Sequence, residues 1–207
     1  MGEDKLFVDV GGRPLIALTL QAVAESAAFT RVVIAAPVER HTQLTELAGS
    51  AGLGEVTVTE GGERRQDSVR LALTKIGEAD IVAVHDAARP LCTPQVFVDC
   101  VEMAARHGAA TVAIPVVDSV KRGLDGVIVQ SLDRHDLFAI QTPQAFHREL
   151  LVAGHRHAIR NAVAVDDDAA LVEAIGAAVH IVAGSPDNFK VTHPRDLVLL
   201  RALVAPR

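Results

Sequence analysis

Short apolar runs alternate with longer amphipathic stretches along the chain. The runs are rich in β-branched residues and lie at 31–37, 55–60, 80–86 and 109–116. Continuous apolar strands of this kind belong to a sheet that is covered on both faces, whereas half-exposed strands alternate apolar and polar positions. The pattern therefore predicts an α/β fold with three layers, in which an open, mostly parallel sheet lies between helices.

Two of the amphipathic stretches carry helix boundary signals. Residues 13–27 place apolar side chains at helical spacing after Pro14, which suits a first helical turn. Residues 93–108 open with Thr93 as a cap and end at Gly108, the residue type preferred just beyond a helix. Both stretches are expected to form helices that pack on the sheet.

Residues 118–142 break this alternation. They contain two short strand-like runs around Asp125-Gly126, which is a strong signal for a hairpin turn. A hairpin inserted late in such a sheet either covers a ligand site or reaches a neighbouring subunit, so we expect an arm here. Beyond the arm the chain returns to helix, strand, loop and a closing helix that begins near Pro194. No linker separates two folding units, and a single domain spanning 1–207 is predicted.

Composition and charge exclude several classes of partner. The formal net charge of −6 argues against a nucleic-acid backbone, because proteins that bind one usually carry a basic face. No apolar run is long enough to span a bilayer. Cys92 and Cys100 fit no metal or redox spacing, and the N-terminus shows no signal segment. The sequence therefore predicts a cytoplasmic protein with no nucleic-acid or membrane partner.

The phrase VAVHDAARPL at 82–91 carries the first candidate site. His85, Asp86 and Arg89 follow an apolar strand, and ligands of open α/β sheets bind beyond the carboxyl ends of the strands. An aspartate there can help to hold a divalent cation, and an arginine three residues later can meet a phosphate. Alternatively, Asp86 and Arg89 pair with each other and cap the loop, and His85 is structural.

The phrase EGGERRQDSV is a second candidate site, for an anion or a base. Gly61 and Gly62 end a strand, and a helix opens near Ser68. Paired glycines let the backbone approach a ligand closely, and the first amides of a helix attract anions. The alternative is a plain turn with Arg64 and Arg65 on a solvated face.

Three weaker candidate sites remain in the sequence. Lys190 follows a turn-forming Pro-Asp-Asn and suits a phosphate as a point charge, although an isolated lysine is usually solvated surface. The acidic run at 166–168 could hold a metal, but aspartate at a helix start is the commoner explanation. His155 and His157 have no third ligand in view for zinc. Taken separately, these signals predict an anion-binding α/β protein.

The exact sequences of these motifs are more specific than the residue types that they contain. The chain contains HDAARP, EGGERRQDSV, LDRHDLFAIQTPQAF, DDDAALVE and DNFKVTHPRDL. In order and approximate spacing these phrases resemble the 2-C-methyl-D-erythritol 4-phosphate cytidylyltransferases of the non-mevalonate isoprenoid pathway, over nearly the whole chain. The resemblance implies a glycosyltransferase-A-like nucleotidyltransferase fold and a homodimer joined by exchanged hairpin arms. It also implies transfer of CMP from CTP to 2-C-methyl-D-erythritol 4-phosphate, release of pyrophosphate, and Mg²⁺ or another divalent cation as cofactor.

The resemblance also implies roles for individual residues. The groups around the cytosine and ribose would come from Gly61, Gly62 and Ser68. The residues that bind the methylerythritol substrate would be Asp86, Arg89, Ser119 and Thr142, with Asp86 facing its hydroxyl groups and the metal region and Arg89 supporting that loop. The catalytic cations would be Lys5, Lys190 and Arg134. Ser119, which stands where the family has threonine, and Arg134 lie on the arm and would serve the neighbouring subunit's site. No metal ligand is assigned.

The beginning of the chain departs from the family pattern. Family members begin with a strand and a glycine-rich loop that wraps the triphosphate and supplies a catalytic arginine. Met1-Gly2 resembles the end of that loop. Lys5 corresponds best to the family's catalytic lysine, but it lies nearer the Met-Gly pair than usual and lacks the customary preceding proline. We therefore expect the natural start of the protein to lie upstream.

Three alternatives stay open at this point. Ribitol 5-phosphate cytidylyltransferases share the fold and CTP, but they would be expected to vary the HDAARP wording. A guanylyltransferase for the molybdenum cofactor has a phrase like MGEDK but lacks the other five phrases. Finally, a chain without the phosphate loop could be an inactive nucleotide-binding remnant.

Overall fold

A computed structural model of the protein describes residues 3–205. The strands are β1 (Asp9–Val10), β2 (Arg13–Pro14), β3 (Arg31–Ala35), β4 (Glu55–Thr59), β5 (Ile81–Val84), β6 (Ala109–Pro115), β7 (Lys121–Leu124), β8 (Val127–Ser131), β9 (Phe138–His147) and β10 (His180–Ala183). The α-helices are α1 (Leu15–Ser26), α2 (His41–Ser50), α3 (Arg65–Leu73), α4 (Pro94–His107), α5 (Arg148–Asn161), α6 (Asp168–Glu173) and α7 (Pro194–Val204). Two 3-10 helices are η1 (Glu3–Phe7) and η2 (Val38–Arg40).

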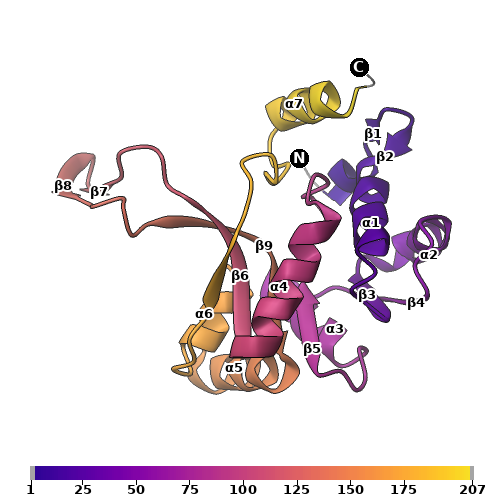
Figure 1. Cartoon of the computed structure of the whole chain (residues 1–207), viewed down its shortest axis with the longest axis horizontal. Coiled ribbons are helices and arrows are strands. Elements are labelled where there is room, and N and C mark those ends of the chain that lie inside the picture. The colour runs from indigo at the N-terminus through magenta and orange to yellow at the C-terminus, as the bar shows by residue number, and fades with distance from the viewer. Residues whose placement is uncertain (1–2, 206–207) are drawn as a thin grey trace.

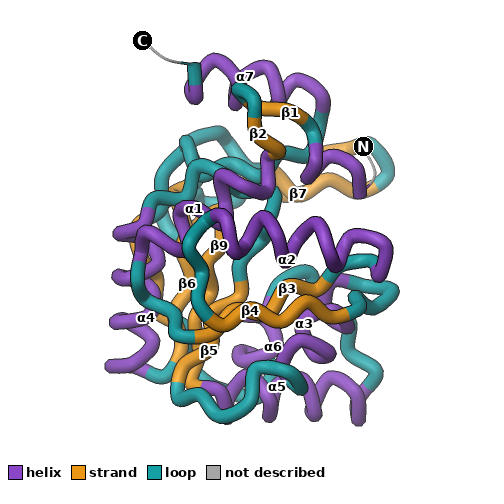
Figure 2. Tube along the Cα trace, turned by 90° about the vertical axis from the view of Figure 1, so that its right-hand side faces the viewer, coloured by secondary structure: helices purple, strands orange, loops and turns teal. Residues whose placement is uncertain are grey.

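The central sheet has the strand order β10-β6-β9-β5 (Figure 1). β9 is antiparallel to both β5 and β6, and β10 is parallel to β6, so β5, β6 and β10 all run in one direction. β3 and β4 form a separate parallel ladder, and α2 lies along it (Figure 2). Within residues 3–205 no ladder joins β3 or β4 to the central sheet. The predicted α/β class and mostly parallel strands are confirmed, although the strands are divided between two ladders.

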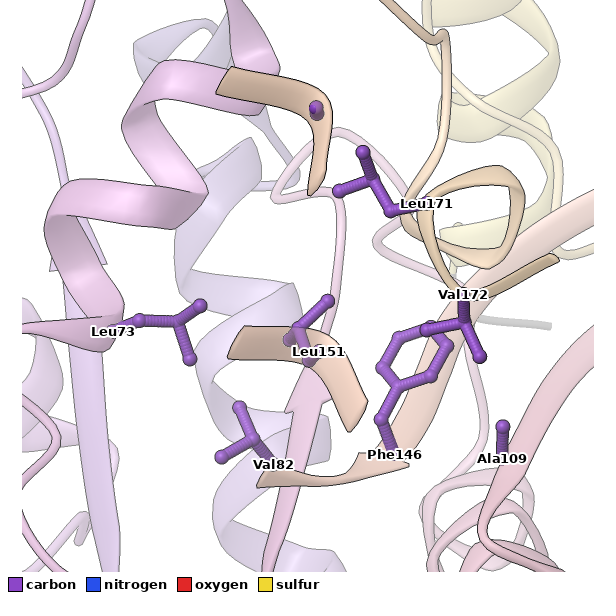
Figure 3. Close-up of a cluster of buried hydrophobic side chains, with 8 residues drawn as sticks. Leu73, Val82, Ala109, Phe146, Leu151, Leu171 and Val172 are labelled. Atoms are coloured by element: carbon purple, nitrogen blue, oxygen red, sulfur yellow. The ribbon is translucent and has the colours of Figure 1, made fainter. Parts of the chain in front are cut away.

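The two faces of the central sheet are buried under different helices. Adjacent residues of β9 point to opposite faces, because side chains alternate along a strand. Phe146 belongs to a cluster with Leu151 of α5 and Val172 of α6, and Figure 3 shows its ring between those two side chains. Ala145 belongs to a second cluster, with Cys100 of α4. The predicted three-layer arrangement therefore follows from the continuous apolar strands.

The predicted helix boundaries hold to within two residues. α1 and α4 occupy the stretches expected, and α4 is followed by Gly108, whose φ of 94° is a conformation that favours glycine. α7 begins at Pro194 as expected. Thr93 occupies the N-cap position of α4 as expected. Its side chain makes no capping hydrogen bond, so the expectation that it caps the helix is wrong.

The predicted hairpin arm is present and projects from the body of the molecule (Figure 1). β7 and β8 pair around Asp125 and Gly126, which have φ values of 50° and 80°. Positive φ at both central residues is the geometry of the tight turns that match strand twist. The arm is exposed from Val117 onward, whereas Gln141 and Thr142 in β9 are 5% and 4% exposed. β9 therefore connects the arm directly to the centre of the sheet.

Candidate functional site

The loop after β5 is held against β9 by hydrogen bonds. The backbone N–H of Asp86 donates to Thr142 Oγ1 at 2.9 Å, and this hydroxyl lies 3.0 Å from His85 Nδ1. The pairing follows from the sheet, because β5 and β9 are neighbours with Val84 opposite Gln144. Within the loop, the N–H of Arg89 donates to the carbonyl oxygen of Asp86 at 3.0 Å. Asp86 thus lies at the carboxyl end of β5, where the sequence predicts a ligand site.

A second loop, between β10 and α7, packs against the first. The N–H of Val191 donates to Ala88 O at 2.8 Å, and Arg89 Nη1 donates to Asn188 O at 2.7 Å. Asn188 Nδ2 in turn donates to Thr142 O at 3.0 Å. Because the two loops are tied together, residues about 100 positions apart in the chain share one site.

Asp86 is the electrostatic centre of this site. Its Oδ2 lies 2.9 Å from Lys190 Nζ and 3.8 Å from Arg89 Nε, and its Oδ1 lies 3.0 Å from Arg65 Nε. Burial opposes ionisation of the carboxyl, but Arg65 and Lys190 outweigh burial and lower the Asp86 pKa to about 2. Even with Asp168, which also pairs with Arg65, the three cations outnumber the two carboxylates, and this excess of positive charge suits a phosphorylated ligand.

The alternative in which Asp86 and Arg89 only cap the loop agrees with the contacts of Arg89 but not with the further partners of Asp86. Arg89 does brace both loops, and it lies at the long distance of 3.8 Å from the carboxylate. Lys190 is 40% exposed and points its ammonium at Asp86, so it is not an isolated surface lysine. The geometry joins Asp86, Arg89, Thr142 and Lys190 into one cluster, and their separate roles stay predictions.

The paired glycines pack closely against the first turn of α3. The N–H of Gly62 donates to Ser68 Oγ at 3.0 Å, and this hydroxyl donates to Arg64 O at 3.2 Å. A Cβ atom at Gly62 would lie 2.4 Å from Asp67 Cβ, a separation that folded proteins do not tolerate. Gly61 has more room, since its Cβ would lie 3.2 Å from Ser68 Oγ. Gly61, Gly62 and Ser68 therefore form one unit at a helix N-terminus, and their contact with a nucleotide stays a prediction.

Three other predicted site residues lie apart from this cluster. Ser119 and Arg134 are on the exposed arm, where Arg134 Nη1 donates to the carbonyl oxygen of Val117. Lys5 lies half-buried in η1. In the described part of the chain no hydrogen bond or ion pair joins any of the three to Asp86. Met1-Gly2, which the sequence likens to the end of a phosphate loop, lies outside the described residues.

Sequence reasoning missed two residues of the cluster. The plain-turn interpretation places Arg65 on a solvated face, yet Arg65 contacts Asp86 and also Asp168, whose Oδ2 lies 2.7 Å from Arg65 Nη1. The expected helix-start aspartate is Asp167, whose side chain accepts from the N–H of Ala170 at 2.9 Å. Asp168 is instead 1% exposed. The one available signal is the doubled arginine just after the glycines, and it could not reveal a partner 103 positions away.

The described residues show neither a grouped metal-binding set of side chains nor a membrane-spanning helix. Within residues 3–205 no three or more His, Cys, Asp or Glu side chains are grouped to hold a metal ion. No helix in this range is long and apolar enough to cross a membrane. Cys92 and Cys100 are buried free thiols, and burial raises the pKa of each to about 12, so neither is a reactive thiolate.

Two buried histidines predict loss of stability in mild acid. Burial lowers the pKa of His85 and of His155 from 6.5 to about 4. Between these values the unfolded chain binds protons that the native protein does not, so stability present above pH 6.5 is lost as the pH falls toward 4. The expected loss is up to roughly 3 kcal/mol for each histidine. Thermal unfolding across this pH range measures it.

The variant His155→Gln isolates one of the two contributions. It should flatten the pH profile, whereas His147→Gln, a change on the surface, should leave the profile as in the wild type. A wild-type melting temperature that stays constant through the window would show that neither buried imidazole resists protonation.

Comparisons with known proteins agree with one another. The family model of 2-C-methyl-D-erythritol 4-phosphate cytidylyltransferase (IspD) matches residues 1–205. A protein of that name from Pelotomaculum thermopropionicum is 40% identical over 207 residues, covering 98% of this chain and 87% of that protein. Another, from Frankia casuarinae, is 42% identical over 208 residues, covering 99% and 75%.

Solved structures give the same result. The crystal structure of the cytidylyltransferase of that name from Thermus thermophilus superimposes with a TM-score of 0.83 at 36% sequence identity, covering 98% of this chain and 94% of that one. The family match spans both loops of the Asp86 cluster and the arm. The chain therefore belongs to the 2-C-methyl-D-erythritol 4-phosphate cytidylyltransferase family.

Proposed function

We propose that this protein transfers CMP from CTP to 2-C-methyl-D-erythritol 4-phosphate in isoprenoid precursor biosynthesis. A phosphate oxygen of the methylerythritol substrate attacks the α-phosphorus of CTP, and the bond from that phosphorus to the bridging oxygen of the β-phosphate breaks. The products are 4-diphosphocytidyl-2-C-methyl-D-erythritol and pyrophosphate. The observation that carries the proposal is the Asp86–Lys190 pair at the carboxyl end of β5, within a chain that matches the family from residue 1 to residue 205.

The residues of the cluster divide the work between the two substrates. Lys190 supplies a positive charge to the phosphates, which stabilises charge that builds up on their oxygens as the reaction proceeds. Asp86 faces the hydroxyl groups of the methylerythritol, and Arg89 and Thr142 hold its loop in place. Gly61, Gly62 and Ser68 approach the cytidine through backbone groups. Lys5 is a further cation for the triphosphate.

A divalent cation, Mg²⁺ in our proposal, accompanies the triphosphate. Magnesium is usually held by substrate phosphates, water and one or two carboxylates rather than by a cage of protein ligands. The cluster fits that manner of binding, because Asp86 offers one partly exposed carboxylate, whereas Asp168, the other carboxylate, is buried and paired with Arg65. When bound, the cation neutralises charge on the phosphates, and the protein residues position them.

The arm is proposed to join two copies of the chain. It exposes apolar side chains that a folded monomer would be expected to bury, namely Val117, Leu124, Val127, Ile128, Val129, Phe138 and Ile140. Exposed apolar surface on this scale favours association. Exchange of arms between protomers covers these side chains and carries Ser119 and Arg134 to the neighbouring site. The homodimer is proposed to work in the cytoplasm, where free thiols such as Cys92 and Cys100 persist.

Pyrophosphate release tests the reaction. Purified protein with CTP, methylerythritol 4-phosphate and Mg²⁺ should release pyrophosphate, and replacement of the acceptor by ribitol 5-phosphate should give far less. Equal or greater activity with ribitol 5-phosphate would move the assignment to that alternative. Absence of turnover together with a melting temperature that CTP raises would favour a nucleotide-binding remnant, because a ligand that binds only the native state stabilises it.

Arg134→Ala tests the role of the arm. Loss of charge-assisted hydrogen bonds to the acceptor phosphate should raise KM for methylerythritol 4-phosphate roughly 10- to 100-fold and leave KM for CTP nearly unchanged. Steady-state kinetics with each substrate varied in turn separates the two. Arg122→Ala, at another exposed arginine of the arm, is the matched control. Equal weakening of both substrates by Arg134→Ala would contradict the arm assignment.

A further inference from the structure

Arg65 contacts two carboxylates that belong to different parts of the fold. It is the first residue of α3, and its guanidinium reaches Asp86 Oδ1 through Nε at 3.0 Å and Asp168 Oδ2 through Nη1 at 2.7 Å. The planar fork of an arginine can serve two acceptors in fixed directions, which a lysine ammonium does not do. Arg65 is thus a bridge between the β5 loop and the start of α6.

Asp168 is the fixed end of this bridge. It is 1% exposed, and its backbone N–H donates to Gln144 Oε1 at 2.9 Å. The same amide oxygen accepts from the N–H of Ala169 at 3.1 Å, and Gln144 itself is fully buried in β9. The backbone at Asp168 is thus anchored to the central strand, and burial leaves its side chain little room to move toward a ligand. Asp168 therefore serves to hold Arg65.

Asp86 is the end of this bridge that faces the proposed ligand site. Its Oδ1 is occupied by Arg65, which leaves Oδ2 toward Lys190 at 2.9 Å and Arg89 at 3.8 Å. The charged and titratable groups around it are therefore Arg65 from α3, His85 and Arg89 from its own loop, and Lys190 from the loop before α7. Without Arg65, both oxygens could turn toward Lys190 and compete with a phosphate for its ammonium.

We infer that Arg65, anchored by Asp168, is a positioning residue for the transfer reaction: it holds Asp86 in one orientation and so keeps Lys190 available to the phosphates. The inference rests on the proposed function, in which Asp86 and Lys190 meet the substrates. It adds two residues that act without touching either substrate. Small displacements of groups that orient reactants lower rates strongly, on the order of 100-fold for about 1 Å.

Kinetics of Arg65→Gln, Arg65→Lys and Asp168→Asn test the inference. Arg65→Gln should lower kcat on the order of 100-fold while KM for CTP changes little. Arg65→Lys keeps the charge but cannot bridge both carboxylates, so it should recover the melting temperature more fully than it recovers kcat. Arg64→Gln is the matched control, because Arg64 is an exposed neighbour that pairs with Asp67, and it should keep wild-type kinetics.

A double-mutant cycle separates positioning from folding. If Arg65 acts through Asp86, then Arg65→Gln should change kcat little in an Asp86→Asn background. Full loss in both backgrounds would mean that Arg65 acts elsewhere, and wild-type kcat in Arg65→Gln and Arg65→Lys would also overturn the inference. Should Asp86→Asn itself be fully active, the proposed role of Asp86 fails as well. If Arg65→Gln does not fold, Arg65→Lys and Asp168→Asn carry the same comparison.

Discussion

Lys190→Ala is expected to lower kcat by roughly 100- to 1000-fold, the effect typical of removing one preorganised group that stabilises transition-state charge. Lys190 is the most exposed cation that contacts Asp86, at 40%, so it is the one best placed to turn toward an incoming phosphate. The variant should fold, because Asp86 keeps Arg65 and Arg89 as partners. Steady-state pyrophosphate release at saturating CTP and methylerythritol 4-phosphate measures the loss.

Lys75→Ala is the control for this variant. It removes the same charge from an exposed position just beyond the end of α3, far along the chain from Lys190, and should leave kcat as it is. Near-normal turnover of Lys190→Ala would mean that Lys190 has no role in the reaction. The Asp86 cluster would then lack its proposed contact with the triphosphate.

Phe146→Ala is expected to destabilise the fold by about 3–5 kcal/mol, the range measured for truncation of a buried aromatic side chain. Phe146 has no exposed surface and lies in the cluster between the central sheet and α5 and α6 (Figure 3). It is also four residues from Thr142 on the same strand, so loss of packing here loosens the strand that holds Asp86. Urea unfolding measures the free energy.

Val198→Ala provides the comparison for Phe146→Ala. Val198 is 68% exposed on α7, and surface substitutions usually change stability by less than about 0.5 kcal/mol. Similar losses for the two variants would mean that the buried cluster does not carry the stability assigned to it.

The sequence predicts those features that depend on local pattern. The apolar runs identify the strands, Gly108 and Pro194 mark helix ends, and the Asp125-Gly126 pair sets the hairpin turn. Each of these signals acts within a few residues, through φ preferences or side-chain alternation. The division of the strands into two ladders was not predicted, because pairing between strands has no local signature.

The sequence likewise predicts only those site residues that a local pattern marks. Asp86, Arg89 and Lys190 could be chosen because each follows a strand or a turn, and the structure brings them together. Arg65 and Asp168 could not, since their ion pair depends on where α3 and α6 pack against the sheet. The doubled arginine offers two equivalent candidates in the sequence, and only the fold distinguishes Arg65, which turns inward, from Arg64, which pairs with Asp67.

The loop that carries Lys190 has a consequence for how the protein is made. Its Val191 is buried in one cluster with Leu15 of α1 and Leu200 of α7, so the position of the loop depends on the last helix along the described chain. Chains leave the ribosome from the N-terminus, and a domain generally folds as a unit. The Asp86–Lys190 pair therefore cannot assemble until α7 has emerged. The contact that this pair is proposed to make with CTP would therefore begin only after α7 has packed.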